Sequence, residues 1–258
     1  MLLPPMDFDP IFLGGECRSG TTLMRVMLDA HSAISCGPET HFLVDDKFRR
    51  FHHHFRGKWW KRAAGYDYST DDMDDLVRDF ARGWFETYMH RQGKRRWADK
   101  TPQTINILPY LWELFPTAKF VHLIRDGRDV ACSIIPKPWG PMNVKDAARR
   151  WVQCIEAGVA HRDDTERYME VRYEDLVHHP ERELRRVMTF VGEEFEPRQL
   201  AYHEHDYDMP KETEASADQV ARPLYTSAIG RYERDLSKRD LKRFEKIAGP
   251  TLDFLGYR

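Results

Sequence analysis

The stretch GGECRSGTTLMRVMLDAH, residues 14–31, decides the fold of this 258-residue chain. The apolar run Ile-Phe-Leu at 11–13 precedes a glycine-rich turn, and the turn opens directly onto an amphipathic helix. In that order, the backbone N–H groups of the turn and of the helix N-terminus all point toward one anion. The sequence therefore predicts a strand, an anion-binding loop and a helix.

The spacing of this loop fits the Walker A frame from Gly15, but Thr21 stands where the frame requires lysine. A loop without that lysine is poorly suited to a β/γ-phosphate pair with magnesium. Arg18, inside the loop, supplies a cation instead. The pattern favours a nucleotide whose 5′ end is not a triphosphate. A P-loop kinase or NTPase and a non-catalytic nucleotide-binding protein are the alternatives.

The composition indicates a globular protein without a general affinity for polyanions. Hydrophobic residues make up 41% of the chain and charged residues 32%, and the formal net charge is -2, so any basic site must be local. No apolar run approaches the length of a bilayer, and the N-terminus lacks the charged and apolar regions of a secretion signal. We expect a cytoplasmic protein with no membrane or nucleic-acid partner.

The four cysteines, Cys17, Cys36, Cys132 and Cys154, are scattered along the chain without a C-x-x-C pair. This spacing predicts reduced thiols rather than a disulfide or zinc framework. Cys17 differs from the others, because a thiol at a helix N-terminus can be acidified and become oxidisable.

Strands alternate with helices along the chain. Apolar runs predict two further buried strands, at 120–124 and 169–173, each followed by a helix. This alternation indicates an α/β fold, with a P-loop-type parallel sheet flanked by helices. A long helix is expected to begin at Ser69 or Thr70. Its apolar stripe comprises Met73, Leu76, Val77, Phe80, Trp84 and Tyr88.

Arg125 and Ser133 provide a second signal for an anion. Ser133 lies about one and a half turns inside the helix that follows Arg125, on a face that can look back toward it. A guanidinium and a hydroxyl form a fork for a second phosphate, whereas the alternative is a surface ion pair and a solvent-facing serine. Because ligands lie beyond the carboxyl ends of parallel strands, we expect the loop, Arg125 and Tyr173 to converge.

The motifs GGECRSGTT (14–22), LIRDGRDVACS (123–133) and VRYEDL (171–176) together resemble the PAPS-dependent sulfotransferases, where PAPS is 3′-phosphoadenosine 5′-phosphosulfate. Within that family the chain is most similar to the tyrosylprotein sulfotransferases, in a soluble, bacterial-type form. The similarity covers nearly the whole chain except residues 49–68. It runs through RSGTTLMRVMLDAH (18–31), CGPETHF (36–42), DKTPQ (99–103), LFPTAKFVHLIRDGRD (114–129), RYEDLVHHPER (172–182) and SADQVARP (216–223).

The resemblance implies a site for PAPS and for its product PAP, the 3′,5′-bisphosphate. The residues that would cradle the 5′-phosphosulfate are Arg18, Ser19, Gly20, Thr21 and Thr22. Arg125 and Ser133 would hold the 3′-phosphate, and Tyr173 would lie against the nucleotide. The run 216–225 would close over it.

The resemblance also implies catalytic roles. Glu39 matches the family's base, and Lys100 and Ser216, helped by Arg18, match its stabilisers of the transferring group. Sulfuryl transfer resembles phosphoryl transfer through a loose, in-line transition state, so positioning and charge stabilisation dominate. His41 is the alternative base. No metal is implied, because arginines and backbone amides already neutralise the donor.

Four positions depart from the pattern of the tyrosylprotein enzymes. Lys137 replaces an arginine near the 3′-phosphate and Arg231 replaces a lysine, which keeps the charge and alters its geometry. His41 replaces an arginine two residues after the base, which bears on acceptor recognition. Ala98 replaces the cysteine that secreted relatives pair with the equivalent of Cys36, so that bond cannot form here.

The implied reaction moves the sulfuryl group of PAPS to an acceptor hydroxyl. Peptide tyrosine is the leading acceptor, and a small phenol, alcohol or carbohydrate is the alternative. We expect one domain over 1–258, with a helical and loop acceptor-side region at about 44–97 and a C-terminal helical segment at about 237–258. The resemblance is compatible with a homodimer.

Residues 47–62, KFRRFHHHFRGKWWKR, have no acidic side chain and many aromatic ones. Three interpretations are open: an acceptor-binding wall, a nucleic-acid-binding surface, or a solvated helix whose aromatics join the core. His52, His53 and His54 are adjacent, and adjacent histidines on one element rarely converge on a single ion. No metal site is therefore predicted.

Overall fold

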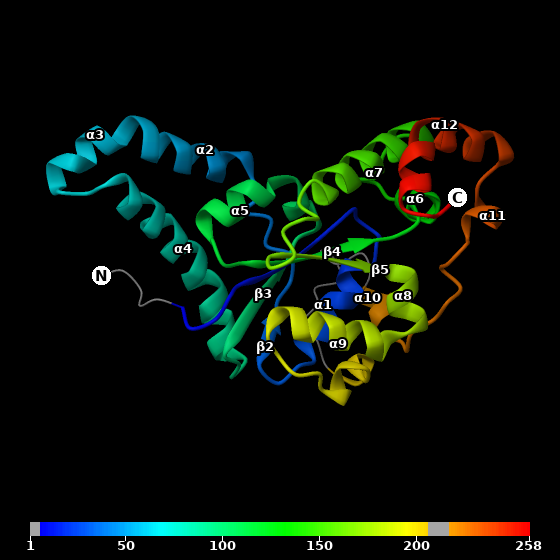
Figure 1. The fold of residues 1–258 in the computed structure, drawn as a ribbon, viewed down its shortest axis with the longest axis horizontal. Helices are drawn as coiled ribbons and strands as arrows, with labels where there is room; N and C mark the ends of the chain where they lie inside the picture. The colour runs from blue at the N-terminus through cyan, green and yellow to red at the C-terminus, as the bar shows by residue number, and fades with distance from the viewer. Residues whose placement is uncertain (1–5, 206–216) are drawn as a thin grey trace.

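The protein was analysed as a computed structural model that describes residues 6–205 and 217–258. Within these residues lies a five-stranded sheet of order β2-β3-β1-β4-β5, in which each neighbouring pair is parallel. Helices flank the sheet (Figure 1), so the expected α/β fold is confirmed. The strands are β1 Ile11–Gly14, β2 Ile34–Cys36, β3 Arg96–Lys100, β4 Lys119–Ile124 and β5 Tyr168–Arg172.

The helices follow the strands in the alternating order that a parallel sheet requires. They are α1 Thr21–Asp29, α2 Asp46–His54, α3 Trp60–Ala63, α4 Thr70–Arg91, α5 Leu108–Leu114, α6 Gly127–Ile134, α7 Val144–Val159, α8 Tyr173–His178, α9 Pro180–Val191, α10 Ala217–Val220, α11 Tyr232–Asp235 and α12 Lys238–Phe254. No helix in the described residues is long and apolar enough to cross a membrane.

The central strand β1 is packed on both faces. Ile11 and Leu13 join one buried cluster with residues of α1, α8 and α9, whereas Phe12 joins a second cluster with residues of α4 and α5. Since alternate residues of a strand point to opposite faces, a fully apolar strand must be covered on both sides. A third cluster joins α6, α7 and α12.

Strands β2 and β3 were not predicted from the sequence. β3 reads RWADK, with charged residues at three of its five positions, yet all five residues are buried. Burial of the two cations is tolerated because they have partners: Arg96 pairs with Glu193, and Lys100 pairs with Glu39. Hydropathy cannot reveal a strand whose charges are satisfied by residues far away in the chain.

Helix α4 begins at the predicted cap. The Ser69 hydroxyl accepts from the Asp72 amide at 3.2 Å, and the Asp72 carboxylate accepts from the Ser69 amide at 2.7 Å. The predicted stripe is partly wrong, because Phe80 and Trp84 are about 60% exposed. Two apolar stripes lie side by side on this helix, and packing against α5 and β3 selects one of them. The buried stripe comprises Met73, Val77, Ala81, Phe85 and Met89.

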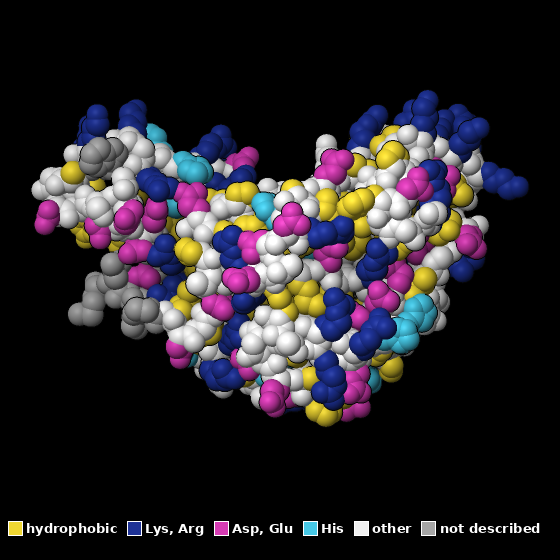
Figure 2. All heavy atoms as spheres, in the orientation of Figure 1, with side chains coloured by type: hydrophobic (Ala, Val, Ile, Leu, Met, Phe, Trp, Pro, Cys, Tyr) yellow, Lys and Arg dark blue, Asp and Glu magenta, His cyan; other side chains and the backbone are white. Residues whose placement is uncertain are grey.

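Helix α2, a π-helical turn at Phe55–Trp59, α3 and α4 form an arm that projects from the body (Figure 1). Figure 2 shows Lys and Arg side chains along its outer edge. Phe51 and Trp59 are about half exposed, so the aromatics of residues 47–62 are only partly in the core. The arm therefore keeps most of its basic and aromatic side chains in contact with solvent.

The three consecutive histidines of the arm do not gather around one point. His52 is buried, with Nδ1 3.1 Å from the Tyr110 hydroxyl and Nε2 3.0 Å from the Asp74 carboxylate, whereas His53 is exposed. In the part of the chain that the structure describes, no group of three or more His, Cys, Asp or Glu side chains could hold a metal ion.

Candidate active site

A cavity of about 740 Å³ lies where the strands end. The loop after β1, the end of β4, the first residue of α8 and a segment at 219–234 all contribute to its wall. The sequence-predicted residues that line it are Arg18, Gly20, Thr21, Thr22, Glu39, His41, Arg125, Ser133, Tyr173 and Arg231. The segments that were expected to converge do so, because the carboxyl ends of parallel strands share one edge of the sheet.

The loop after β1 depends on unusual backbone conformations. Gly20 has φ +95°, and a Cβ there would lie 2.6 Å from the ring of Tyr173. Arg18 adopts φ 75°, which is costly for a residue with a side chain. Among residues 6–205 and 217–258 no side chain caps the N-terminus of α1, so its first amides can bind another group. This combination suits an anion.

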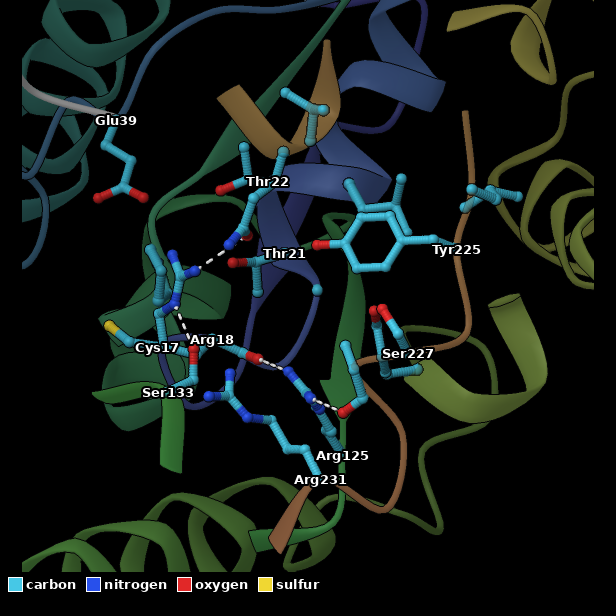
Figure 3. A pocket seen from close by; sticks show the side chains of 18 of the residues that line it. Cys17, Arg18, Thr21, Thr22, Glu39, Arg125, Ser133, Tyr225, Ser227 and Arg231 are labelled. Atoms are coloured by element: carbon cyan, nitrogen blue, oxygen red, sulfur yellow. Dashed lines mark hydrogen bonds between the residues drawn. The ribbon is translucent and has the colours of Figure 1, made fainter. Parts of the chain in front are cut away.

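Arg18 and Arg125 join the loop to the β4–α6 segment. Arg18 Nε donates to Ser133 Oγ at 3.0 Å, and Arg125 Nη1 donates to the Arg18 carbonyl at 2.9 Å (Figure 3). The Arg125 guanidinium lies 4.5 Å from the centroid of the Tyr173 ring. Burial, and then repulsion from Arg125, lowers the pKa of Arg18. An anion bound between these cations would relieve that repulsion.

The segment 219–234 covers one side of the cavity. Asp129 of α6 accepts from the backbone amides of Gly230 at 2.8 Å and Tyr232 at 3.0 Å, and Arg125 donates to the Ala228 carbonyl. Tyr225 and Ser227 of this segment line the cavity, and the Tyr225 ring points toward Thr21 (Figure 3). The segment is thus anchored to the same helix that carries Ser133.

The predicted closing run is described in part. Ser216 lies outside the described residues, so its predicted role stays a prediction. Gln219 lines the cavity and accepts from Arg18 Nη2 at 3.0 Å. The part of the run that forms α10 therefore contacts the anion-binding loop through Gln219.

Glu39 lies between Lys100 and His41. Its carboxylate pairs with Lys100 and lies 2.9 Å from His41 Nε2. Lys100 is fully buried, and its ammonium also lies 3.4 Å from the Thr22 hydroxyl. Burial acts to raise the pKa of Glu39, but the hydrogen bonds and charges of His41 and Lys100 outweigh it and hold that pKa below its usual value. The hydrogen bond that His41 donates to Glu39 raises the pKa of His41.

Three of the predicted residues that the structure describes do not line the cavity: Ser19, Lys137 and the fully buried Lys100. Ser19 is buried within the loop, where its amide donates to the Glu16 carbonyl at 3.1 Å. Lys137 lies in the turn after α6 and does not line the cavity; two residues further along, Trp139 does. A cationic role for Lys137 at the 3′-phosphate therefore stays a prediction. Arg231 does line the cavity and pairs with Asp235 at 2.7 Å.

The cysteines are free thiols. The expected acidification of Cys17 is wrong, because burial raises its pKa to about 11 and the nearby Glu16 carboxylate adds to the rise. A helix N-terminus cannot acidify a thiol that is taken out of water beside a carboxylate. Cys36 lies opposite Ala98 in the β2–β3 register, so the position that faces it on the neighbouring strand carries no thiol.

Sequence reasoning missed several residues of the wall. Arg150 of α7 and Gln103, which follows β3, line the cavity together with Tyr202 and Arg234. Arg150 is one of two consecutive arginines in an amphipathic helix, and nothing local distinguishes it from its neighbour Arg149. Gln103 belongs to the DKTPQ motif and could have been found there. The predicted acceptor-side region 44–97 contributes no described residue to this wall, so its role stays a prediction.

Comparison with known proteins places this architecture in a family. The model of the Sulfotransferase family matches residues 10–197. A protein-tyrosine sulfotransferase of Drosophila melanogaster is 32% identical over 261 residues, covering 96% of this chain and 51% of the relative. A putative protein-tyrosine sulfotransferase of Caenorhabditis briggsae is 31% identical over 256 residues, covering 96% of this chain and 88% of the relative. The chain thus spans about half the length of the Drosophila protein.

Solved structures have the same fold. The sulfotransferase domain of the Synechococcus PCC 7002 olefin synthase superposes with a TM-score of 0.65 at 20% identity, covering 96% of this chain and 98% of that domain. The mouse sulfotransferase SULT7A1, solved in complex with PAP, superposes with a TM-score of 0.58 at 12% identity, covering 95% of this chain and 85% of that one. Fold, cavity and sequence agree, and the chain belongs to the sulfotransferase family.

Proposed function

We propose that this sulfotransferase moves the sulfuryl group of PAPS to the hydroxyl of a tyrosine in a protein or peptide. The observation that carries the proposal is the position of Lys100. Its ammonium contacts both Glu39, the proposed base, and Thr22 in the first turn of α1, where the donor would be held. One buried cation therefore lies beside both the proposed base and the proposed donor site, which a group transfer must bring together. The names of the 31–32% identical relatives support tyrosine as the acceptor.

The donor would occupy the anion-binding loop and the arginines beside it. The free amides at the start of α1, with Thr21 and Thr22, suit the 5′-phosphosulfate. Arg125 and Ser133 suit the 3′-phosphate, because a guanidinium and a hydroxyl at hydrogen-bonding distance from Arg18 form one continuous basic surface. A ligand with anions at both ribose corners would satisfy both ends.

The residues divide the chemistry between them. Glu39 would take the proton of the acceptor hydroxyl as its oxygen bonds to sulfur. The bond between sulfur and the bridging oxygen breaks, and Lys100 would donate a hydrogen bond to that oxygen as negative charge develops on it. Arg18 would stabilise the transferring group. PAP would leave with the negative charge on the former bridging oxygen. The transition state is loose, so positioning and charge supply most of the acceleration.

Two measurements test the proposal. Calorimetry should detect PAP binding well above that of ATP or AMP, since only PAP carries the 3′-phosphate that Arg125 would bind. Transfer from radiolabelled PAPS should favour an acidic tyrosine peptide over small phenols and sugars. Tight ATP binding without a preference for PAP would reject the donor, and efficient transfer to phenols alone would reject the peptide acceptor.

A further inference from the structure

A polar cluster lines the cavity beside the anion-binding loop and is not used by the chemistry above. It consists of Cys17, Gln103 and Arg150, which line the cavity, and of the buried Glu16; all four line a smaller cavity of about 80 Å³. In Figure 3, Cys17 lies on the side of Arg18 away from Tyr225. The cluster therefore borders the part of the cavity that the nucleotide-facing residues leave open.

Arg150 is held in a defined position. Its Nε lies 2.9 Å from a Glu16 carboxylate oxygen, which also accepts from the Cys17 amide at 3.0 Å. Its Nη2 lies 3.4 Å from Cys17 Sγ. Glu16 is almost fully buried, whereas the Arg150 side chain is about one-third exposed. A buried carboxylate thus fixes one edge of the guanidinium, and within residues 6–205 and 217–258 no hydrogen bond occupies Nη1.

The position of Arg150 relates it to the acceptor rather than to the donor. Cys17 Sγ lies 3.4 Å from Arg150 Nη2, and Figure 3 shows Cys17 and Glu39 on the same side of Arg18, away from Tyr225. Arg150 and the proposed base therefore line the same part of the cavity. The anions of the donor already have Arg18, Arg125 and Ser133, so Arg150 is available to another anion that approaches Glu39.

We infer that Arg150 is a specificity-determining residue that binds a carboxylate of the acceptor next to the hydroxyl that is sulfated. Arginine forms two parallel hydrogen bonds with a carboxylate, and its free edge offers donors for them. Glu16 is then a positioning residue, because it orients the guanidinium without touching the acceptor. This inference rests on the proposed function and names the chemistry that would select among tyrosine hydroxyls.

The test compares two tyrosine peptides of equal length, one with Asp and Glu around the tyrosine and one with Asn and Gln. Arg150→Met should raise KM for the acidic peptide and lower kcat/KM about 10- to 100-fold, while kcat/KM for the neutral peptide and the Kd for PAP stay unchanged. Arg149→Met is the matched control, because Arg149 directly precedes Arg150 in α7, is exposed and pairs with Asp146 outside the cavity. This control should leave kcat/KM unchanged for both peptides.

Removal of Arg150 leaves the buried Glu16 without its cation, which can weaken the fold. The double variant Glu16→Gln/Arg150→Met removes both charges, and it should show the same loss of selectivity with a normal Kd for PAP. Equal losses on both peptides, or no loss, would overturn the inference. If the wild-type protein sulfates neither peptide, the peptide acceptor of the proposed function fails. Arg150→Met with 4-hydroxyphenylacetate and its amide then decides the role of Arg150 separately.

Discussion

Two regions of this molecule are rich in basic and aromatic residues, but only one of them forms a cavity. At the sheet edge, Arg18 and Arg125 are 107 residues apart in the chain and are joined by a hydrogen bond. On the arm, the basic residues of 47–62 follow one another along short helices and lie mostly in solvent. Residues that are neighbours along a helix spread around its axis, whereas the ends of parallel strands bring distant residues into one hollow. Convergence, rather than local charge density, makes the site.

The largest effect should come from the cavity. Glu39→Gln keeps the shape of the side chain and removes its basicity, so kcat should fall about 10²- to 10⁴-fold. Transfer from radiolabelled PAPS measures kcat, and calorimetry should give an unchanged Kd for PAP. Glu181→Gln, on the exposed surface of α9, is the control and should have no effect. A collapse of PAP binding in Glu39→Gln would instead give that side chain a structural role.

The contrast between the two regions can be tested directly with arginines. Arg125→Ala should weaken PAP about 10- to 100-fold, because a charge-assisted contact to the 3′-phosphate is lost, and should leave AMP nearly unchanged. Arg50→Ala on the arm should alter neither affinity. Calorimetry with PAP and AMP gives all four values. Equal weakening of PAP and AMP by Arg125→Ala would mean that Arg125 does not read the 3′ position.

Within the arm, burial should separate two adjacent histidines. His52→Ala removes a side chain that contacts both Tyr110 and Asp74. The Tyr110 hydroxyl loses that partner while Asp74 keeps its ion pair with Arg56, and the loss should cost about 1–3 kcal/mol of unfolding free energy. His53→Ala, at an exposed position, should change it by less than about 0.5 kcal/mol. Urea unfolding measures both. Equal values would show that the buried contacts of His52 contribute nothing net to stability.

The smallest expected effect is a shift in pH dependence. His41 helps to hold the pKa of Glu39 below its usual value. Glu39 therefore stays ionised until the pH falls below this lowered pKa. His41→Ala removes this influence and raises the pKa of Glu39, so the acid limb of the kcat/KM profile should move to higher pH. A profile measured in His41→Asn serves as the comparison for side-chain volume. If activity were lost at every pH instead, His41 rather than Glu39 would be the base.

The comparison also shows how far the sequence could be interpreted. Gly20 and Thr21 were found because one short motif, at 14–22, encodes the turn and the helix start, and Arg125 because another, at 123–133, encodes the strand end. Arg150 was not, because nothing local distinguishes it from Arg149; only the packing of α7 beside the loop brings it into the cavity wall. Tertiary packing also explains the exposed stripe on α4. The sequence of this helix contains two adjacent apolar stripes, and α5 and β3 cover only one of them.

The sequence by itself determined the α/β alternation and the glycine-rich loop, whereas the groups proposed to act in transfer were implied by the resemblance to a family. The alternation and the loop depend on backbone conformation and residue order over a few turns of chain, which local chemistry controls. Only the tertiary structure decided that Lys100 lies in a buried strand between Glu39 and Thr22, and that Cys17 has a raised rather than a lowered pKa. Burial, and charged residues that are distant in the sequence but close in the fold, control both outcomes. Neither is a property of neighbouring residues in the chain.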